Sequence, residues 1–181
     1  ARLLPGWLVH HILRIAMRIP RKGALHTASR NATATPPVVA PDVAPAGSAR
    51  QKIDFTDQVV IVTGAGRGLG RLYALEFAQR GAAVVVNDLG SSMHGDGADG
   101  GVADQVVDEI RRNGGKAVAA HRAVASPEGG EAIVRTAIEH FGRLDAVVSN
   151  AGIFGSVDFE NLTTDEWRRM LNVHLDGSFF L

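Results

Sequence analysis

The chain has 181 residues, with 19 lysines and arginines against 19 aspartates and glutamates, and it contains no cysteine. This length suits one globular domain with an extension, and the lack of cysteine excludes a disulfide scaffold, a thiolate nucleophile and a zinc-thiolate site. No apolar run in the sequence approaches the roughly 20 residues that a membrane-spanning helix needs.

The amino-terminal residues 1–51 differ in composition from the rest of the chain. Seven of the 19 basic residues and six of the seven prolines precede residue 51, but only one acidic residue does, Asp42. A proline-rich stretch with little apolar surface cannot offset its chain entropy by burial, so we predict that residues 23–51 form a disordered linker. We therefore divide the chain into a basic extension, 1–51, which we expect to be largely disordered, and a folded domain, 52–181.

Within the extension, Leu8, Ile12, Ile15 and Ile19 fall at helical spacing, and arginines lie mostly on the other side. This pattern predicts a basic amphipathic helix, which is typical of a transit peptide or a membrane-surface segment. An extension without such a function is the alternative. We expect a cytoplasmic protein, or an organellar one if the extension is a transit peptide.

From residue 52 onward, apolar runs of strand type alternate with helical spacing. Strands are expected at 59–62, 83–86, 117–124 and 146–149, and helices at 69–80, 102–112, 126–141 and from 163. Ser126-Pro127 suits a helix start, and Thr163-x-x-Glu166 has the spacing of a capping box. The alternation predicts an α/β fold with a Rossmann-type, doubly wound parallel sheet, which we expect to stop after its fourth strand and the following helix.

A glycine-rich turn, Thr63-Gly64-Ala65-Gly66-Arg67-Gly68-Leu69-Gly70, follows the first predicted strand. A turn that leads into a helix presents backbone N–H groups to a phosphate, and glycine allows close approach. The turn is not a P-loop, because no Gly-Lys-Ser/Thr follows, and Leu69 stands where G-x-G-x-x-G needs its last glycine. The pattern T-G-x-x-x-G-x-G predicts a pyrophosphate site, with a plain tight turn as the alternative.

Asp88 closes the second predicted strand, 18 residues after Gly70. A carboxylate in this place accepts hydrogen bonds from the adenosine ribose hydroxyls and repels a 2′-phosphate, which favours NAD over NADP. Arg67 in the turn acts in the opposite direction, since a guanidinium can pair with that phosphate. We give Asp88 more weight and expect NAD.

Together these residues resemble the short-chain dehydrogenase/reductase family. Besides the glycine-rich turn, Asn150-Ala151-Gly152 after the fourth strand matches the N-A-G motif of that family, which steadies the central sheet beside the cofactor. Within the family, Val86-Asn87-Asp88-Leu89-Gly90 and Val173-His174-Leu175 most resemble the (3R)-hydroxyacyl-CoA dehydrogenase domain of peroxisomal multifunctional enzymes and their bacterial relatives. The resemblance covers about residues 55–181.

The resemblance implies a nicotinamide dinucleotide site. Its residues would be Gly64, Gly68, Leu69 and Gly70 at the pyrophosphate, with Arg67 beside them, Asp88 and Leu89 at the adenosine, Val124 near the adenine, and Asn150, Ala151 and Gly152 at the nicotinamide. Two departures stand out. Ala123 replaces the acidic residue usual before Val124, and His174 replaces an asparagine of the proton-relay site. His174 is our one candidate catalytic residue, with a purely structural histidine as the alternative.

The family's catalytic serine and Tyr-x-x-x-Lys pair are not found in this chain. The one tyrosine, Tyr73, has Phe77 four positions later and is expected to pack in the core. We therefore expect the amino-terminal part of a longer NAD-dependent oxidoreductase, inactive by itself. The complete enzyme would transfer hydride between nicotinamide and a secondary alcohol or ketone, such as a hydroxyacyl thioester. The alternatives are a catalytically silent dinucleotide-binding protein and a chain whose function lies in residues 1–50.

The remaining patterns predict few other partners. Basic residues of the folded part do not cluster, so we expect no nucleic-acid binding. His94, His121 and His140 lack the spacing of metal ligands, so we expect no metal site. The expected partner is a small-molecule substrate, and the complete enzyme is expected to be a homo-oligomer.

Overall fold

The computed structural model describes residues 16–18, 53–92, 94–97, 99–155 and 157–181. The helices and strands reported below belong to one of the two compact units of the chain. None of the described helices combines the length and the apolar character needed to cross a bilayer.

Four parallel strands form the centre of the fold. In spatial order they are β5 (Ala146–Val148), β2 (Val59–Thr63), β3 (Ala83–Asn87) and β4 (Lys116–Ala120). Every residue of β2 and β3 is buried, as their continuous valine-rich sequences predict for strands covered on both faces. Thr63 pairs with Asn87 in the parallel register, so the carboxyl ends of the two central strands lie at one edge of the sheet.

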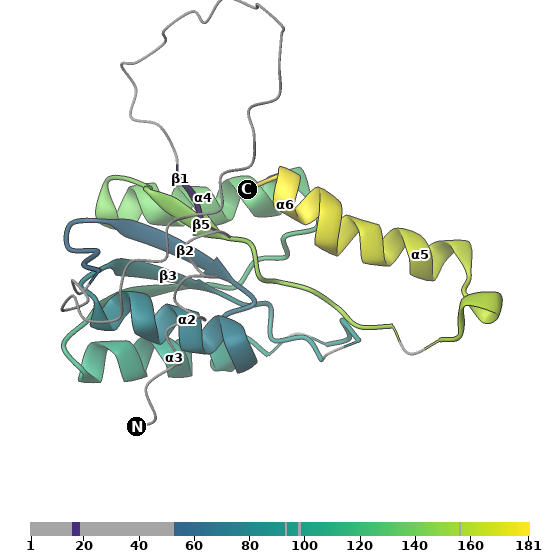
Figure 1. The fold of residues 1–181 in the computed structure, drawn as a ribbon, viewed down its shortest axis with the longest axis horizontal. Coiled ribbons are helices and arrows are strands. Elements are labelled where there is room, and N and C mark those ends of the chain that lie inside the picture. The colour runs from purple at the N-terminus through teal and green to yellow at the C-terminus, as the bar shows by residue number, and fades with distance from the viewer. Residues whose placement is uncertain (1–15, 19–52, 93, 98, 156) are drawn as a thin grey trace, which may run out of the picture. The chain divides into compact units, whose positions relative to one another are not determined.

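Helices cover both faces of this sheet (Figure 1). α2 (Gly68–Gln79) and α3 (Gly101–Arg112) lie on one face, and α4 (Pro127–Phe141) lies on the other. Successive residues of a strand point to opposite faces. Val60 and Val62 accordingly belong to the core cluster with Phe77 of α2, whereas Ile61 belongs to the cluster with Ile133 of α4. The predicted doubly wound α/β fold is confirmed.

Two predicted helix starts are confirmed by their caps. The Ser126 hydroxyl accepts a hydrogen bond from the Gly129 amide at 3.1 Å, and Pro127 takes the first helical position of α4. Thr163 and Glu166 form a complete capping box at the start of α5 (Thr164–Leu171). Hydrogen bonds from the Thr163 hydroxyl and amide lower the pKa of the Glu166 carboxyl.

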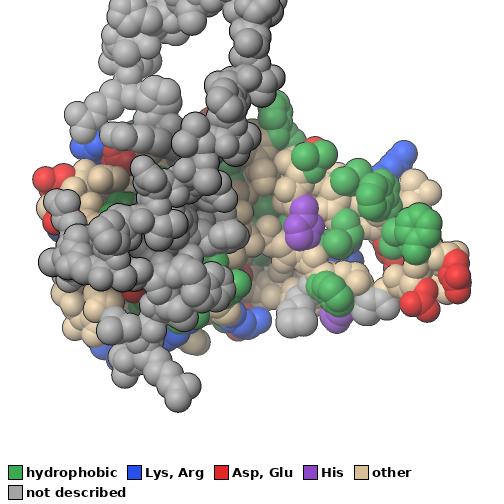
Figure 2. All heavy atoms as spheres, viewed as in Figure 1, with side chains coloured by type: hydrophobic (Ala, Val, Ile, Leu, Met, Phe, Trp, Pro, Cys, Tyr) green, Lys and Arg blue, Asp and Glu red, His purple; other side chains and the backbone are tan. Residues whose placement is uncertain are grey.

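The last helical segment is less regular than its sequence predicts. α5 follows a short 3₁₀ turn, η1 (Phe159–Asn161), and runs into a π-helical turn, η2 (Asn172–Asp176), and then α6 (Gly177–Phe179). No residue of α5 is buried. In Figure 2 exposed hydrophobic side chains gather over this part of the molecule. The exposed large hydrophobic residues of these elements include Trp167, Leu175 and Phe179. α5 therefore contributes little to the core.

Two sequence predictions are wrong in detail. The helical spacing in the extension predicted a helix through residues 16–18, but these residues form strand β1 (Ala16–Arg18). β1 pairs antiparallel with β5, and this pairing satisfies backbone groups of β5 that would otherwise lie at the edge of the sheet. The other predictions for residues 1–51 lie outside the described residues. The third predicted strand, 117–124, ends at Ala120 as β4, and residues 121–124 leave the sheet.

Candidate functional site

The glycine-rich turn joins β2 to α2. Gly64 and Gly68 have φ angles of +62° and +54°, a left-handed backbone that favours glycine. A Cβ added at Gly68 would meet no heavy atom within 4 Å, so the turn is open at this point. A Cβ added at Gly70 would lie 2.1 Å from the Gly64 carbonyl oxygen, so Gly70 allows the first turn of α2 to pack directly beneath the loop.

Hydrogen bonds tie the turn to the Asn-Ala-Gly motif, although the two are more than 80 residues apart in the chain. The buried Thr63 hydroxyl accepts the amides of Asn150 and Ala151 at 3.1 and 3.0 Å. The Asn150 side-chain amide donates to the carbonyl oxygens of Thr63 and Gly64 at 2.9 and 3.2 Å. These bonds fix the carboxyl ends of β2 and β5 side by side.

Thr63→Val is expected to destabilise the protein although it conserves the shape of the side chain. The change removes the acceptor of two part-buried backbone amides that follow β5, and a donor left unsatisfied inside the protein costs about 1–3 kcal/mol. We expect the free energy of unfolding to fall by about 2–3 kcal/mol in urea denaturation. Thr63→Ser keeps the hydroxyl and serves as the control, with a loss of less than about 1.5 kcal/mol for the deleted methyl group. Equal losses in the two variants would contradict this role.

Asp88 lies at the carboxyl end of β3, beside the turn. Its carboxylate accepts the Gly66 amide at 2.8 Å and the Gly90 amide at 2.7 Å, one on each oxygen. A carboxylate has about four lone-pair positions, so each oxygen can accept one more hydrogen bond. A Cβ at Gly66 would lie 2.9 Å from this carboxylate, which explains the glycine there. The carboxylate is thus held in place and can still bind a pair of hydroxyl groups.

Asn87 shapes the opposite side of the site. Its side chain is buried, and its amide donates to the carbonyl oxygens of Ala120 and Arg122, both at 2.8 Å. These two bonds fix the segment that follows β4, and this segment leads along the edge of the sheet to Val124. The sequence analysis quoted Asn87 only as part of a motif and gave it no role.

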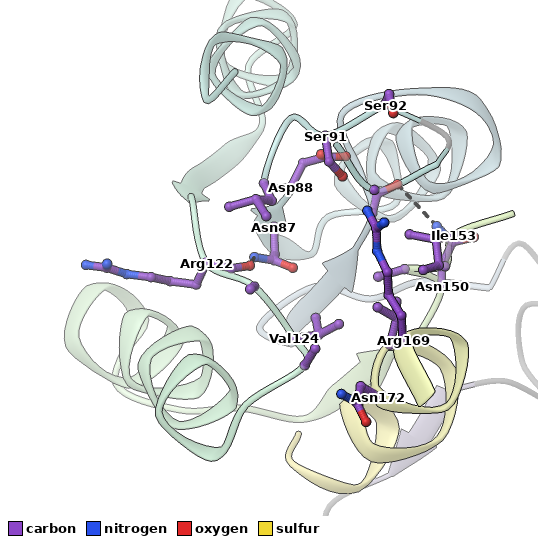
Figure 3. Close-up of a pocket in the computed structure, with 18 of the residues that line it drawn as sticks. Asn87, Asp88, Ser91, Ser92, Arg122, Val124, Asn150, Ile153, Arg169 and Asn172 are labelled. Atoms are coloured by element: carbon purple, nitrogen blue, oxygen red, sulfur yellow. Dashed lines mark hydrogen bonds between the residues drawn. The ribbon is translucent and has the colours of Figure 1, made fainter. Parts of the chain in front are cut away.

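A cavity of about 420 Å³ opens at this edge of the sheet (Figure 3). Of the predicted cofactor residues, those that line it are Gly64, Arg67, Asp88, Leu89, Val124, Asn150, Ala151 and Gly152. Gly68, Leu69 and Gly70 are not among its lining residues, because Gly70 packs under the turn and the half-exposed Leu69 lies on the helix beyond it.

The cavity also includes residues that the sequence analysis did not assign to the cofactor site, although it quoted Asn87, Ala123 and Val173 in motifs. They are Asn87, Ser91, Ser92, Gly95, Arg122, Ala123, Ala125, Ile153, Arg169, Asn172 and Val173. Most of them come from loops, which have no hydrophobic period to place them, or from the irregular last helical segment. In Figure 3 Arg169 extends from α5 toward the loop with Ser91 and Ser92, whereas the side chain of Arg122 points away from the cavity.

His174, the candidate catalytic residue, lies next to the cavity but does not line it. Its Nε2 is 2.8 Å from the Ile153 carbonyl oxygen and 3.2 Å from the Ile153 amide nitrogen, so the imidazole donates to the first or accepts from the second, according to its tautomer. A Cβ at Gly152 would lie 2.6 Å from the imidazole ring. His174 therefore supports the backbone of the Asn-Ala-Gly loop. Among the described residues, no group of three histidines and carboxylates is arranged to hold a metal ion.

Comparisons with known proteins agree with this geometry. Residues 58–181 match the short chain dehydrogenase family. The chain belongs to this family. Over 125 residues it is 54% identical to peroxisomal multifunctional enzyme type 2 of Mus musculus, covering 69% of this chain and 17% of that protein. It is 50% identical over 129 residues to peroxisomal multifunctional enzyme A of Dictyostelium discoideum, covering 71% of this chain and 29% of that protein.

Among solved structures, a short-chain dehydrogenase from Mycobacterium avium matches with a TM-score of 0.64 and 46% sequence identity. The match covers 70% of this chain and 44% of the other. The chain thus spans less than half the length of each of these three proteins. The short-chain dehydrogenase resemblance predicted from the sequence is confirmed, and with it membership in a family of oxidoreductases that use NAD or NADP.

Proposed function

We propose that residues 52–181 are the dinucleotide-binding part of an NAD-dependent short-chain dehydrogenase. The observation that carries this proposal is the Asp88 carboxylate, held by two backbone amides at the cavity beside the glycine-rich turn. Two vicinal ribose hydroxyls suit its remaining lone pairs, and a 2′-phosphate would be repelled. Arg67 also lines the cavity and favours NADP, but we expect the fixed carboxylate to dominate.

The residues of the cavity fit such a cofactor in three places. Gly64 and Arg67 bring the turn to the cavity where the pyrophosphate would lie, and the turn is open at the adjacent Gly68. Leu89 and the buried Val124 offer apolar contact for the adenine, and the Asn150–Gly152 loop adjoins the nicotinamide. The bound cofactor would accept or donate a hydride. The residues of this chain would bind and orient it, and His174 would keep the loop beside the nicotinamide in place.

We further propose a secondary alcohol or ketone as substrate, with a hydroxyacyl thioester as the leading class. The similarity to peroxisomal multifunctional enzymes supports this class. The same similarity, together with the basic extension as a targeting segment, supports an organellar location over the cytoplasmic one. A homo-oligomeric complete enzyme remains our expectation.

Calorimetric titration of the purified protein tests the cofactor assignment. We expect saturable binding of NAD and weaker binding of NADP, because only NADP brings a phosphate against Asp88. We also expect no dehydrogenase turnover from these 181 residues, since the sequence contains no Tyr-x-x-x-Lys pair to move the proton. Failure of a folded protein to bind either nucleotide would contradict the proposed function, and measurable turnover would show that another residue acts as the acid.

A further inference from the structure

Arg169 connects two parts of the cavity that are distant in the sequence. Its guanidinium donates to the Asp96 carboxylate at 2.9 Å, across 73 residues of chain. Asp96 belongs to the loop after β3, and the same loop supplies Ser91, Ser92 and Gly95 to the cavity lining. We call these three residues the loop wall.

The loop wall approaches α5 closely at this contact. Gly95 has a φ angle of +83°, and a Cβ added there would lie 2.8 Å from the Arg169 guanidinium and 3.0 Å from the Ile153 side chain. A second bond lies next to the first, since the His94 Nδ1 is 3.0 Å from the Phe154 carbonyl oxygen. Both bonds join the loop after β3 to the chain that follows β5.

The ion pair matters because α5 has little else to hold it. No residue of α5 is buried, so its packing on the core is weak. The other hydrogen bonds of the described part of this loop include those from the Gly95 amide to the Ser92 carbonyl oxygen and from the His94 and Asp96 amides to the Ser92 hydroxyl. These bonds shape the loop from within but do not tie it to α5. The ion pair joins α5 to the loop after β3, and neither segment packs firmly on the core. Even a weak ion pair can therefore set the distance between them.

We propose that Arg169 is a positioning residue of the nucleotide cavity. Through Asp96 it holds the loop wall against α5, and it thereby slows the release of a bound dinucleotide. This inference rests on the proposed function. The pair is partly exposed, with side-chain exposures of 48% for Arg169 and 73% for Asp96, so it adds little to global stability.

Asp96→Asn and Arg169→Gln test the proposal by stopped-flow release of NADH, whose fluorescence reports binding. We expect each variant to raise the dissociation rate constant by about twofold to fivefold, with an unchanged melting temperature. The charge-swapped double variant, Asp96→Arg with Arg169→Asp, should recover most of the slow release, which a purely structural defect would not do. Asp99→Asn is the matched control, because Asp99 lies in the same loop but bonds the Gly101 amide at the start of α3 rather than α5.

Hydrogen exchange of the ligand-free protein separates this proposal from the proposed function. Peptides that contain Ser92 and Gly95 should exchange faster in Asp96→Asn and in Arg169→Gln than in the unaltered protein. If the unaltered protein binds no nucleotide, the proposed function fails, and a role in slowing release fails with it. If it binds NADH but release and exchange are the same in both variants, or if the charge swap restores nothing, the positioning role of Arg169 is wrong.

Discussion

Gly70→Ala is expected to abolish dinucleotide binding and to lower stability sharply. The added methyl carbon would lie 2.1 Å from the Gly64 carbonyl oxygen and 2.5 Å from the Asn150 side-chain nitrogen, distances at which atoms overlap. The first neighbour is backbone and the second is bonded to the turn, so neither can move without opening the junction between turn and helix. Overpacking of this kind costs about 1–3 kcal/mol or more, and we expect about 3 kcal/mol by urea denaturation.

Helix propensity would predict the opposite result, since alanine is favoured over glycine inside a helix by about 0.5–1 kcal/mol. The sign of the measured change therefore decides between packing and propensity. Gly155→Ala is the matched control, because a Cβ there has its nearest neighbour, the Met170 sulfur, at 4.0 Å. Equal stability and equal NAD affinity in the two variants would mean that the turn does not need its close contact with α2.

Asp88→Ala is expected to weaken NAD binding by roughly tenfold to a hundredfold. Hydrogen bonds to a charged group contribute about 1.5–3 kcal/mol, and the variant loses those to the ribose. NADP should weaken much less, because the same change removes the repulsion of its 2′-phosphate and leaves Arg67 in place. Calorimetric titration with both nucleotides gives the ratio directly.

The second nucleotide also controls for structural damage. Asp88 accepts the amides of Gly66 and Gly90, so its loss disturbs the turn for either ligand. A parallel fall in the affinities for NAD and NADP would show that Asp88 acts only by holding those amides, and the assigned role in ribose recognition would then be wrong. A fall for NAD alone would support it.

The central sheet was predictable because its strands are short, apolar and separated by amphipathic helices. The predicted run 83–86 became Ala83–Asn87, and the predicted helix 102–112 became Gly101–Arg112. The third strand was predicted to end four residues too late, at 124 instead of Ala120. An apolar run does not distinguish a strand from an extended segment. Here the Asn87 side chain bonds the Arg122 carbonyl oxygen, which lies beyond the end of β4.

The sequence predicted the parts of the candidate site that belong to a motif. It did not predict the parts that tertiary contacts bring to the cavity. The turn, Asp88 and Asn150–Gly152 follow from sequence and converge on the cavity. Arg169 does not, because its contribution depends on an ion pair across 73 residues. The π-helical turn at Asn172–Asp176 was also missed, since a one-residue change of helical register leaves no clear mark on the hydrophobic pattern.

The junction of Thr63 with Asn150 also has a consequence for the order of assembly. β2, β3 and β4 follow one another along the chain and pair in sequence, whereas β5 must return across β3 and β4 to lie beside β2. Closing that longer loop costs more chain entropy, so we expect β5 to dock late. A nascent chain would acquire its capacity to bind ligand only at this final step, and ligand capture would then report complete folding.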